Sequence, residues 1–194
     1  MTALALTLAL LLAPVATPLL SGRTGPQPPK ANPVGTAVLG FKERVDQYVK
    51  VHNEAESQVP KLVETNDPAK VTTREAALGE AIKRLRQHAR EGDIFGADFR
   101  AILAKEVRED FRGRPAADRK ALVQELPAKM AIAVNMSYPV NLPLATFPAR
   151  LLQKLPPLPP ELEYRIVGHH IVLRDVTANV IADVARNIVP TIPS

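Results

Sequence analysis

The hydrophobic pattern in the first half of the chain has the period of an α-helix. Over residues 36–59, apolar positions recur at alternating intervals of three and four residues, and Pro60 follows. Charged residues occupy the other faces, so the segment predicts an amphipathic helix. Its apolar face carries Val38, Phe41, Val45, Tyr48, His52, Ala55 and Val59, of which Phe41, Val45, Tyr48 and His52 are candidate structural residues.

Three further helices are predicted downstream. Thr72 and Glu75 have the spacing of a capping box, and the apolar period behind them continues to Gly92. A turn signal at residues 66–68 separates this second helix from the first, which favours an antiparallel helical hairpin. A third helix is predicted over residues 96–112 and a fourth over residues 115–126, before Pro127.

The pattern then changes to the period of a strand. Over residues 131–138 apolar and small or polar residues alternate, which predicts a half-buried strand. Residues 149–155 favour one or two helical turns, and the proline-rich residues 156–160 predict a stiff extended spacer. Strands are predicted over residues 162–167, 170–174 and 179–184, with a hairpin turn at Gly168 and His169.

The three C-terminal strands predict a small meander. Leu162, Tyr164 and Ile166 share one face, and Leu173 of the next strand is expected to pack with them. The third segment also contains good helix formers, so a helix there stays an alternative. The sequence therefore predicts an α+β protein, with an N-terminal hairpin or bundle of three to four helices, then a strand and an antiparallel β-meander.

The N-terminus has the features of a secretory signal. Residues 1–20 contain no charged side chain, and the prolines at positions 14 and 18 interrupt the apolar run. We expect a signal peptide over residues 1–22 and an exported, periplasmic or envelope protein; a retained anchor and a buried helix are the alternatives. A proline-rich tether is expected over residues 23–35, a helical region over 36–127, and the strand, spacer and meander over 128–194.

Composition excludes several classes of function. The 194 residues include no Cys, which excludes a disulfide scaffold, a zinc finger and a thiol nucleophile. Aromatic residues make up 4%, which argues against a base-stacking nucleic-acid surface. The basic residues Lys83, Arg86 and Arg90 share a predicted helix face, but acidic neighbours favour a mixed, solvated surface. We expect no nucleic-acid partner, and membrane contact only through an uncleaved N-terminal segment.

The sequence carries two resemblances to known proteins. The run LPLATFPARLLQKLPPLPPELEYRIVGHHIVLRDVTANVIADVARNIVP, the spacing of Phe41, Val45, Tyr48 and His52, and the residues at 92–95 resemble a group of uncharacterised exported bacterial proteins. This resemblance covers most of the mature chain and implies export and a shared fold. Leu155-Pro156-Pro157, Tyr164-Arg165 and Leu173-x-Asp175 are similar to small periplasmic proteins of the nickel/cobalt-homeostasis type, which implies a link to metal.

The adjacent histidines His169 and His170 are the candidate metal ligands. Imidazole is a frequent ligand of Ni²⁺, Cu²⁺ and Zn²⁺, but adjacent strand residues point to opposite faces and no third ligand is near in sequence. A polar hairpin tip is the simpler interpretation. His52, on the apolar face of the first helix, is either a core-edge residue with one hydrogen bond, a buried pH switch or a ligand.

The sequence favours a non-enzymatic protein. It contains no nucleophile elbow, phosphate-binding glycine loop or zinc-protease motif, and its late serines, Ser57, Ser137 and Ser194, have no catalytic context. The leading hypothesis is an envelope protein, without a resident cofactor, that binds another protein, a surface or its own copies. The alternatives are a metal-responsive protein that uses His169 and His170, and a hydrolase with a carboxylate pair.

Overall fold

The structure, a computed structural model, describes residues 32–61, 63, 65–123, 131–139 and 147–191. The chain divides into two units, residues 1–30 and 31–194, and every described residue belongs to the second. The described part of this unit forms five helices followed by a three-stranded antiparallel sheet, which confirms the predicted α+β class with helices first and a C-terminal meander. The predicted signal peptide lies outside the described residues.

Helix α1 (Pro33–Ser57) begins three residues earlier than the hydrophobic pattern predicts. The Asn32 side chain accepts a hydrogen bond from the Val34 N–H at 3.1 Å, and Pro33 occupies the first turn. Proline is favourable there because its missing N–H would have no helical partner. The end of the predicted tether, residues 33–35, is therefore helical.

Helix α2 (Pro68–Leu85) corrects the predicted capping box. Asp67 is the N-cap and accepts a hydrogen bond from the Ala69 N–H at 3.0 Å. Thr72 lies inside the helix, where its hydroxyl donates to the Pro68 carbonyl at 3.0 Å. The Asp-Pro pair supplies a cap and a preset first turn, so it takes precedence over the later Thr-Glu signal. The helix ends at Leu85 rather than continuing to Gly92.

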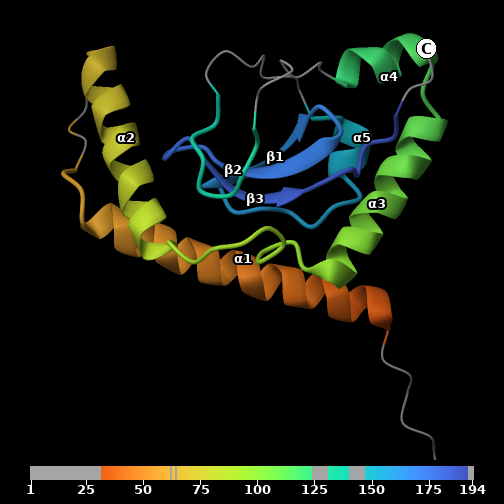
Figure 1. The fold of residues 1–194 in the computed structure, drawn as a ribbon, viewed down its shortest axis with the longest axis horizontal. Coiled ribbons are helices and arrows are strands. Elements are labelled where there is room, and N and C mark those ends of the chain that lie inside the picture. The colour runs from red at the N-terminus through yellow and green to blue at the C-terminus, as the bar shows by residue number, and fades with distance from the viewer. Residues whose placement is uncertain (1–31, 62, 64, 124–130, 140–146, 192–194) are drawn as a thin grey trace, which may run out of the picture. The chain divides into compact units, whose positions relative to one another are not determined.

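The other helices frame the sheet. Helix α3 (Ala97–Arg112) has the predicted bounds to within one residue. Helix α4 (Ala116–Leu122) lies in the predicted fourth helix but ends four residues before the predicted residue 126, because the backbone of its C-cap, Val123, is already extended. Figure 1 shows α1 running below the sheet, with α2 and α3 steeply inclined to it on either side. Among the described residues, no helix combines the length and apolarity that a membrane crossing requires.

The meander follows the prediction closely. Strands β1 (Leu162–Val167), β2 (His170–Asp175) and β3 (Val180–Ala185) lie in the order β1-β2-β3, and a two-residue turn at Gly168 and His169 joins the first two. The register pairs Leu162 with Asp175 and Tyr164 with Leu173. The third segment is a strand and not a helix, and all six of its residues are buried.

The predicted strand over residues 131–138 is only partly extended. It forms one isolated antiparallel bridge, between Ser137 and Val180, and a turn at Asn135, whose φ of 62° breaks the extended backbone. The alternating pattern still marks the side that faces the sheet, because Ile132 and Tyr138 are buried. The predicted strand is therefore corrected to an irregular segment that accompanies β3.

The sheet is buried on both faces. On the helix side, the rings of Phe41, Phe99 and Tyr164 form part of an aromatic stack, with 4.0 Å between the centroids of Phe41 and Phe99. On the other side, a smaller cluster joins the sheet to residues 131–138. The short helix α5 (Ala149–Leu152) and residues 156–159, which form no helix or strand, lead into β1.

Candidate functional site

The side chain of Asp175, at the end of β2, is the centre of a buried polar cluster. One carboxylate oxygen accepts the Tyr48 hydroxyl at 2.9 Å and lies 2.6 Å from His52 Nδ1. The other accepts the Thr177 N–H and hydroxyl, both at 3.1 Å, and the Ala178 N–H at 2.9 Å. Asp175 is 0% exposed and His52 3%. This group, here called the Asp175 cluster, fastens α1 to the sheet.

The His52–Asp175 contact is an ion pair whenever the imidazole is protonated. The hydrogen bond that His52 donates to Asp175 raises the pKa of His52 above its ordinary 6.5, against the opposing effect of burial. Burial alone would raise the pKa of Asp175, but His52 and the other donors hold it below its ordinary 3.8. Burial and the nearby Asp175 raise the pKa of Tyr48, so its hydroxyl stays protonated and donates.

A second buried carboxylate, Asp183 in β3, is held by backbone groups. One oxygen accepts the N–H groups of Gly92 at 2.8 Å and Val184 at 2.7 Å, and the other accepts those of Ile94 and Phe95, both at 2.8 Å. Burial raises the pKa of Asp183, while these four donors act in the opposite direction. The carboxylate fixes the segment between α2 and α3 against the sheet.

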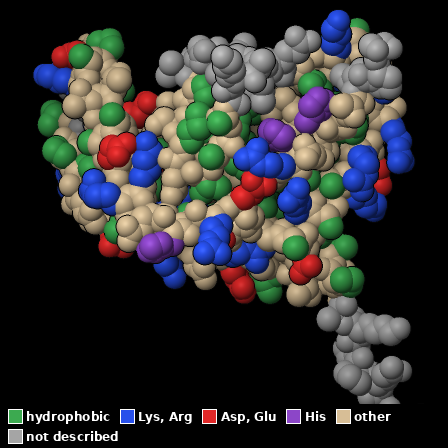
Figure 2. Space-filling view, in the orientation of Figure 1, with side chains coloured by type: hydrophobic (Ala, Val, Ile, Leu, Met, Phe, Trp, Pro, Cys, Tyr) green, Lys and Arg blue, Asp and Glu red, His purple; other side chains and the backbone are tan. Residues whose placement is uncertain are grey.

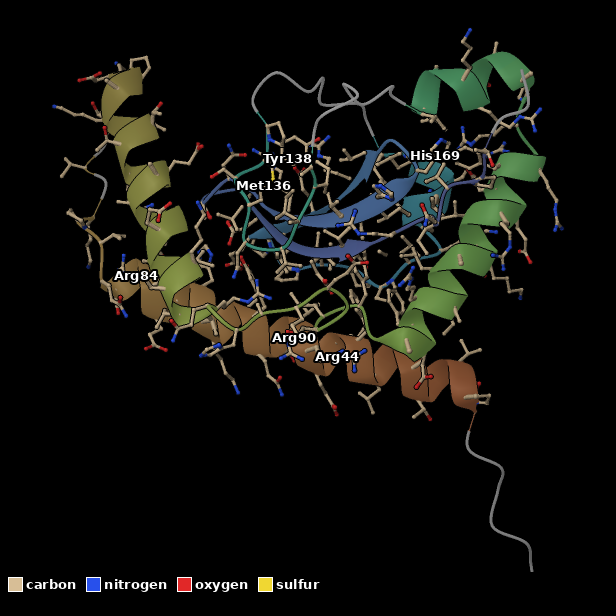
Figure 3. The ribbon with its side chains drawn as sticks, in the orientation of Figure 1. Arg44, Arg84, Arg90, Met136, Tyr138 and His169 are labelled. Carbon is tan, nitrogen blue, oxygen red and sulfur yellow. The ribbon has the colours of Figure 1, made fainter. Side chains whose placement is uncertain are left out.

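Two arginines complete this polar framework. Arg44 of α1 donates to the carbonyls of Ile94 at 2.7 Å and Phe95 at 3.1 Å (Figure 3). Arg86, which caps α2, donates to the Ala182 carbonyl at 3.0 Å, and its guanidinium lies over the Tyr48 ring, 4.9 Å from the centroid. Both cations therefore bind the interior segments together.

The basic run predicted to be solvated needs a correction at Arg86. Since α2 ends at Leu85, Lys83, Arg86 and Arg90 do not share one helix face. Arg86 turns inward and is partly buried, whereas Arg90 is exposed. Elsewhere the surface carries the predicted mixture of charges, since Figure 2 shows basic and acidic side chains interspersed over the visible face.

The candidate metal ligands lie at the hairpin between β1 and β2. His169 Nδ1 is 3.2 Å from the Val189 carbonyl, and His170 Nδ1 accepts the Asn187 N–H at 3.1 Å. Figure 3 labels His169 beside the sheet, well away from Arg84. Burial and the charges of Arg186 and His169 lower the pKa of His170. Within the described ranges, no three or more His, Asp or Glu side chains are grouped to hold a metal ion.

The other residues singled out from the sequence lie in the core. Phe41, Val45, Tyr48, Tyr164 and Leu173 are all buried. The Tyr164 hydroxyl also donates to the Pro156 carbonyl at 3.1 Å, and burial raises its pKa well above the ordinary value. Tyr164 therefore links β1 to the proline-rich stretch before it.

An apolar groove runs between α5, the proline-rich stretch and β1. Its volume is about 860 Å³, and its apolar lining residues are Phe147, Leu152, Leu155, Pro157, Leu158, Leu162 and Tyr164. Leu152 is 48% exposed, which is high for a large aliphatic side chain. The polar lining comes from Gln153, Glu163 and Arg165, and Glu163 and Arg165 are ion-paired at 2.6 Å.

The described residues contain little that resembles a hydrolytic site. Four grooves formed by the described residues each have at most one acidic side chain in their lining. The Ser57 hydroxyl donates to the Glu54 carbonyl at 2.7 Å, and that of Ser137 accepts from Lys83 at 3.2 Å. Ser194 lies outside the described residues. Neither described serine is therefore hydrogen-bonded to a histidine base.

No family model, curated protein or solved structure matches the chain. The resemblances to exported bacterial proteins and to the nickel/cobalt-homeostasis type therefore stay predictions, and function has to be inferred from the geometry.

Sequence reasoning located His52 and Tyr48 but missed the carboxylates that they and the loop depend on. The strand predicted over residues 170–174 ends before Asp175, and Asp183 lies in the strand predicted over residues 179–184, and the pattern gives neither carboxylate a partner. A signal was present, because an acidic residue within the apolar stretch of residues 179–184 requires donors if it is buried. The sequence does not identify those donors, since the Gly92 N–H lies 91 positions from Asp183, and His52 lies 123 positions from Asp175.

Proposed function

We propose that this chain is an exported envelope protein that acts by binding another protein, without catalysis. The uncharged, apolar residues 1–20 support export. The apolar groove between α5 and β1 is the observation that carries the binding function. An apolar depression with a polar rim is typical of surfaces that receive a partner's apolar side chains.

The groove fits an apolar segment better than a charged one. Most of its lining is aliphatic or aromatic, and its two charged residues, Glu163 and Arg165, neutralise each other. Arg174 adds a second ion pair to Glu163 at 2.8 Å. A partner that places apolar side chains on Leu152 and Leu158 would remove this surface from water, which favours association by about 25 cal/mol per Å² buried before the costs of ordering.

The strongest polar groups, by contrast, serve the fold. Asp175 and Asp183 are both 0% exposed and each accepts hydrogen bonds at both oxygens. Such carboxylates stabilise a structure and have no access to a substrate. Nothing in the described residues favours the metal-responsive or hydrolytic alternative over binding.

Site-specific photocrosslinking in cells that export the full chain tests the proposal. A photoreactive amino acid at Leu152, in the groove, is expected to give a discrete adduct, whereas one at Val71 is not. Val71, on α2, is a matched control because it is also an exposed aliphatic residue, at 43% against 48%. Mass spectrometry of the adduct distinguishes an envelope partner from a second copy of the chain.

A second arm ties the adduct to the groove. Leu152→Glu, with the photoreactive group moved to Pro157, is expected to abolish crosslinking, while Val71→Glu leaves it unchanged. An identified partner should then bind the purified chain, and bind the Leu152→Glu variant at least tenfold more weakly. Equal labelling from Leu152 and Val71, or no discrete adduct from the groove, contradicts the proposal.

A further inference from the structure

Three carboxylates, those of Asp175, Glu56 and Glu161, act on His52 in the Asp175 cluster. Asp175 faces His52 from the end of β2, and its Oδ2 lies 2.6 Å from His52 Nδ1. Glu56, one turn further along α1, is ion-paired with Arg74 of α2 at 2.6 Å. Glu161, just before β1, has one buried carboxylate oxygen without a hydrogen-bond partner. Its negative charge and that of Glu56 both act on His52.

The nearby cation of Arg86 makes its contacts with groups other than Asp175. Arg86 lies over the Tyr48 ring and donates to the Ala182 carbonyl and the Asn135 side chain. Among the described contacts of Asp175, His52 is therefore the only side chain that can bring a positive charge into direct contact with it.

We propose that the His52–Asp175 contact is a proton-controlled latch that holds the C-terminal half of α1 on the sheet. The latch is tight while the imidazole is protonated and loosens when it loses its proton. This inference stands independently of the proposed binding function, because it concerns the attachment of α1 and not the groove.

The direction of the pH effect follows from the charges. The folded protein raises the pKa of His52, so it binds the proton more strongly than the unfolded chain does. The stability from the ion pair is therefore complete below the unfolded pKa of about 6.5 and is lost as the pH rises through the folded pKa. Above that pH, neutral His52 still donates to Asp175, but the buried carboxylate keeps a charge that no cation compensates.

A second limit exists at acidic pH. The pKa of Asp175 is lowered in the folded protein, so its contribution is present above the unfolded value of about 3.9 and is lost as the pH falls through the folded pKa. The ion pair therefore holds α1 on the sheet only between two pH limits. Protonation of Asp175 sets the acidic limit, and deprotonation of His52 sets the alkaline limit.

An NMR titration of the full wild-type chain tests the latch in the unaltered protein, and a variant is needed only to assign the signal. The His52 ring signal, assigned by its absence from the spectrum of His52→Gln, is expected to titrate above pH 6.5. Chemical denaturation from pH 5 to pH 10 then measures the consequence. For each unit by which the folded pKa of His52 exceeds 6.5, the equilibrium constant for unfolding should rise about tenfold between a pH below 6.5 and a pH above that folded pKa.

The matched control is His88→Gln, since His88 is exposed and lies outside the cluster. The wild type and His88→Gln are expected to lose stability together as the pH rises, while His52→Gln lacks that loss. A His52 signal that titrates at or below pH 6.5, or the same pH dependence with and without His52, overturns the proposal. These outcomes do not depend on groove crosslinking, so failure of the latch and failure of the binding function are distinguishable.

Discussion

Two carboxylates in the same sheet show how the kind of donor decides the chemistry of a buried charge. Asp175 and Asp183 are both 0% exposed and both accept several short hydrogen bonds. Asp175 is hydrogen-bonded to a titratable imidazole, and its pKa is lowered, whereas Asp183 accepts its hydrogen bonds from backbone N–H groups, and burial raises its pKa. Neutral dipoles hold a loop in place, whereas a cationic partner also couples the fold to the proton concentration.

Removal of the backbone-bonded carboxylate is expected to have the largest effect. Asp183→Ala leaves four N–H groups without their acceptor, so we expect a loss of about 4 kcal/mol in the free energy of unfolding. Urea denaturation at pH 7 measures it, with Asp46→Ala on the exposed face of α1 as the control. A loss below about 1 kcal/mol would mean that other contacts hold the segment between α2 and α3.

Asp175→Asn is the corresponding test of the imidazole-bonded carboxylate. The amide keeps one acceptor for the Thr177 and Ala178 N–H groups but cannot pair with imidazolium, so we expect a loss of about 2 kcal/mol at pH 6. The loss should shrink at higher pH, because wild-type His52 is then neutral as well. Denaturation curves at pH 6 and pH 9 measure this, and equal losses at both would contradict the ion pair.

Tyr48→Phe separates the neutral donor of the cluster from the titrating one. The substitution removes the hydroxyl that donates to Asp175 but keeps the ring beneath Arg86. We expect a loss of about 1 kcal/mol that varies little between pH 6 and pH 9. A strong pH dependence of this loss would show that Tyr48 is part of the titration.

The hairpin histidines should show the smallest effect. His169 and His170 use their Nδ1 atoms at different backbone positions, so Ni²⁺, Co²⁺, Cu²⁺ or Zn²⁺ is expected to leave the melting temperature unchanged. Thermal melts of the wild type and of the double variant His169→Ala/His170→Ala measure this. A metal that binds with a Kd a hundredfold below its concentration would add about 2.7 kcal/mol, and a rise that the double variant loses would favour the metal-responsive alternative.

The difference between the two carboxylates also marks how far sequence reasoning reaches. Local signals predicted the meander, the apolar face of α1 with Tyr48 and His52, and the bounds of α3, because periodicity and turn residues act over a few positions. They failed at Thr72, where the nearby Asp67-Pro68 pair supplied a stronger start, and at residues 131–138, where Asn135 turns the backbone.

The contacts of the buried arginine and carboxylate side chains could be identified only from the tertiary structure. Arg86 belongs by sequence to a charged run, yet packing places it over Tyr48 and against the Ala182 carbonyl. The donors of Asp183 come from backbone groups around Gly92, which carry no side-chain signal at all. Long-range hydrogen bonds of this kind depend on how the helices, loops and strands pack together. The only sign of them in a single sequence is an acidic residue within an otherwise apolar strand.

The titration of His52 in the wild type and in Asp175→Asn is the most direct test of the account. If a cationic partner sets the chemistry of the buried carboxylate, the His52 pKa lies above 6.5 in the wild type and falls in the variant. A His52 pKa that is the same in both proteins would contradict the coupling of α1 to the sheet through this proton.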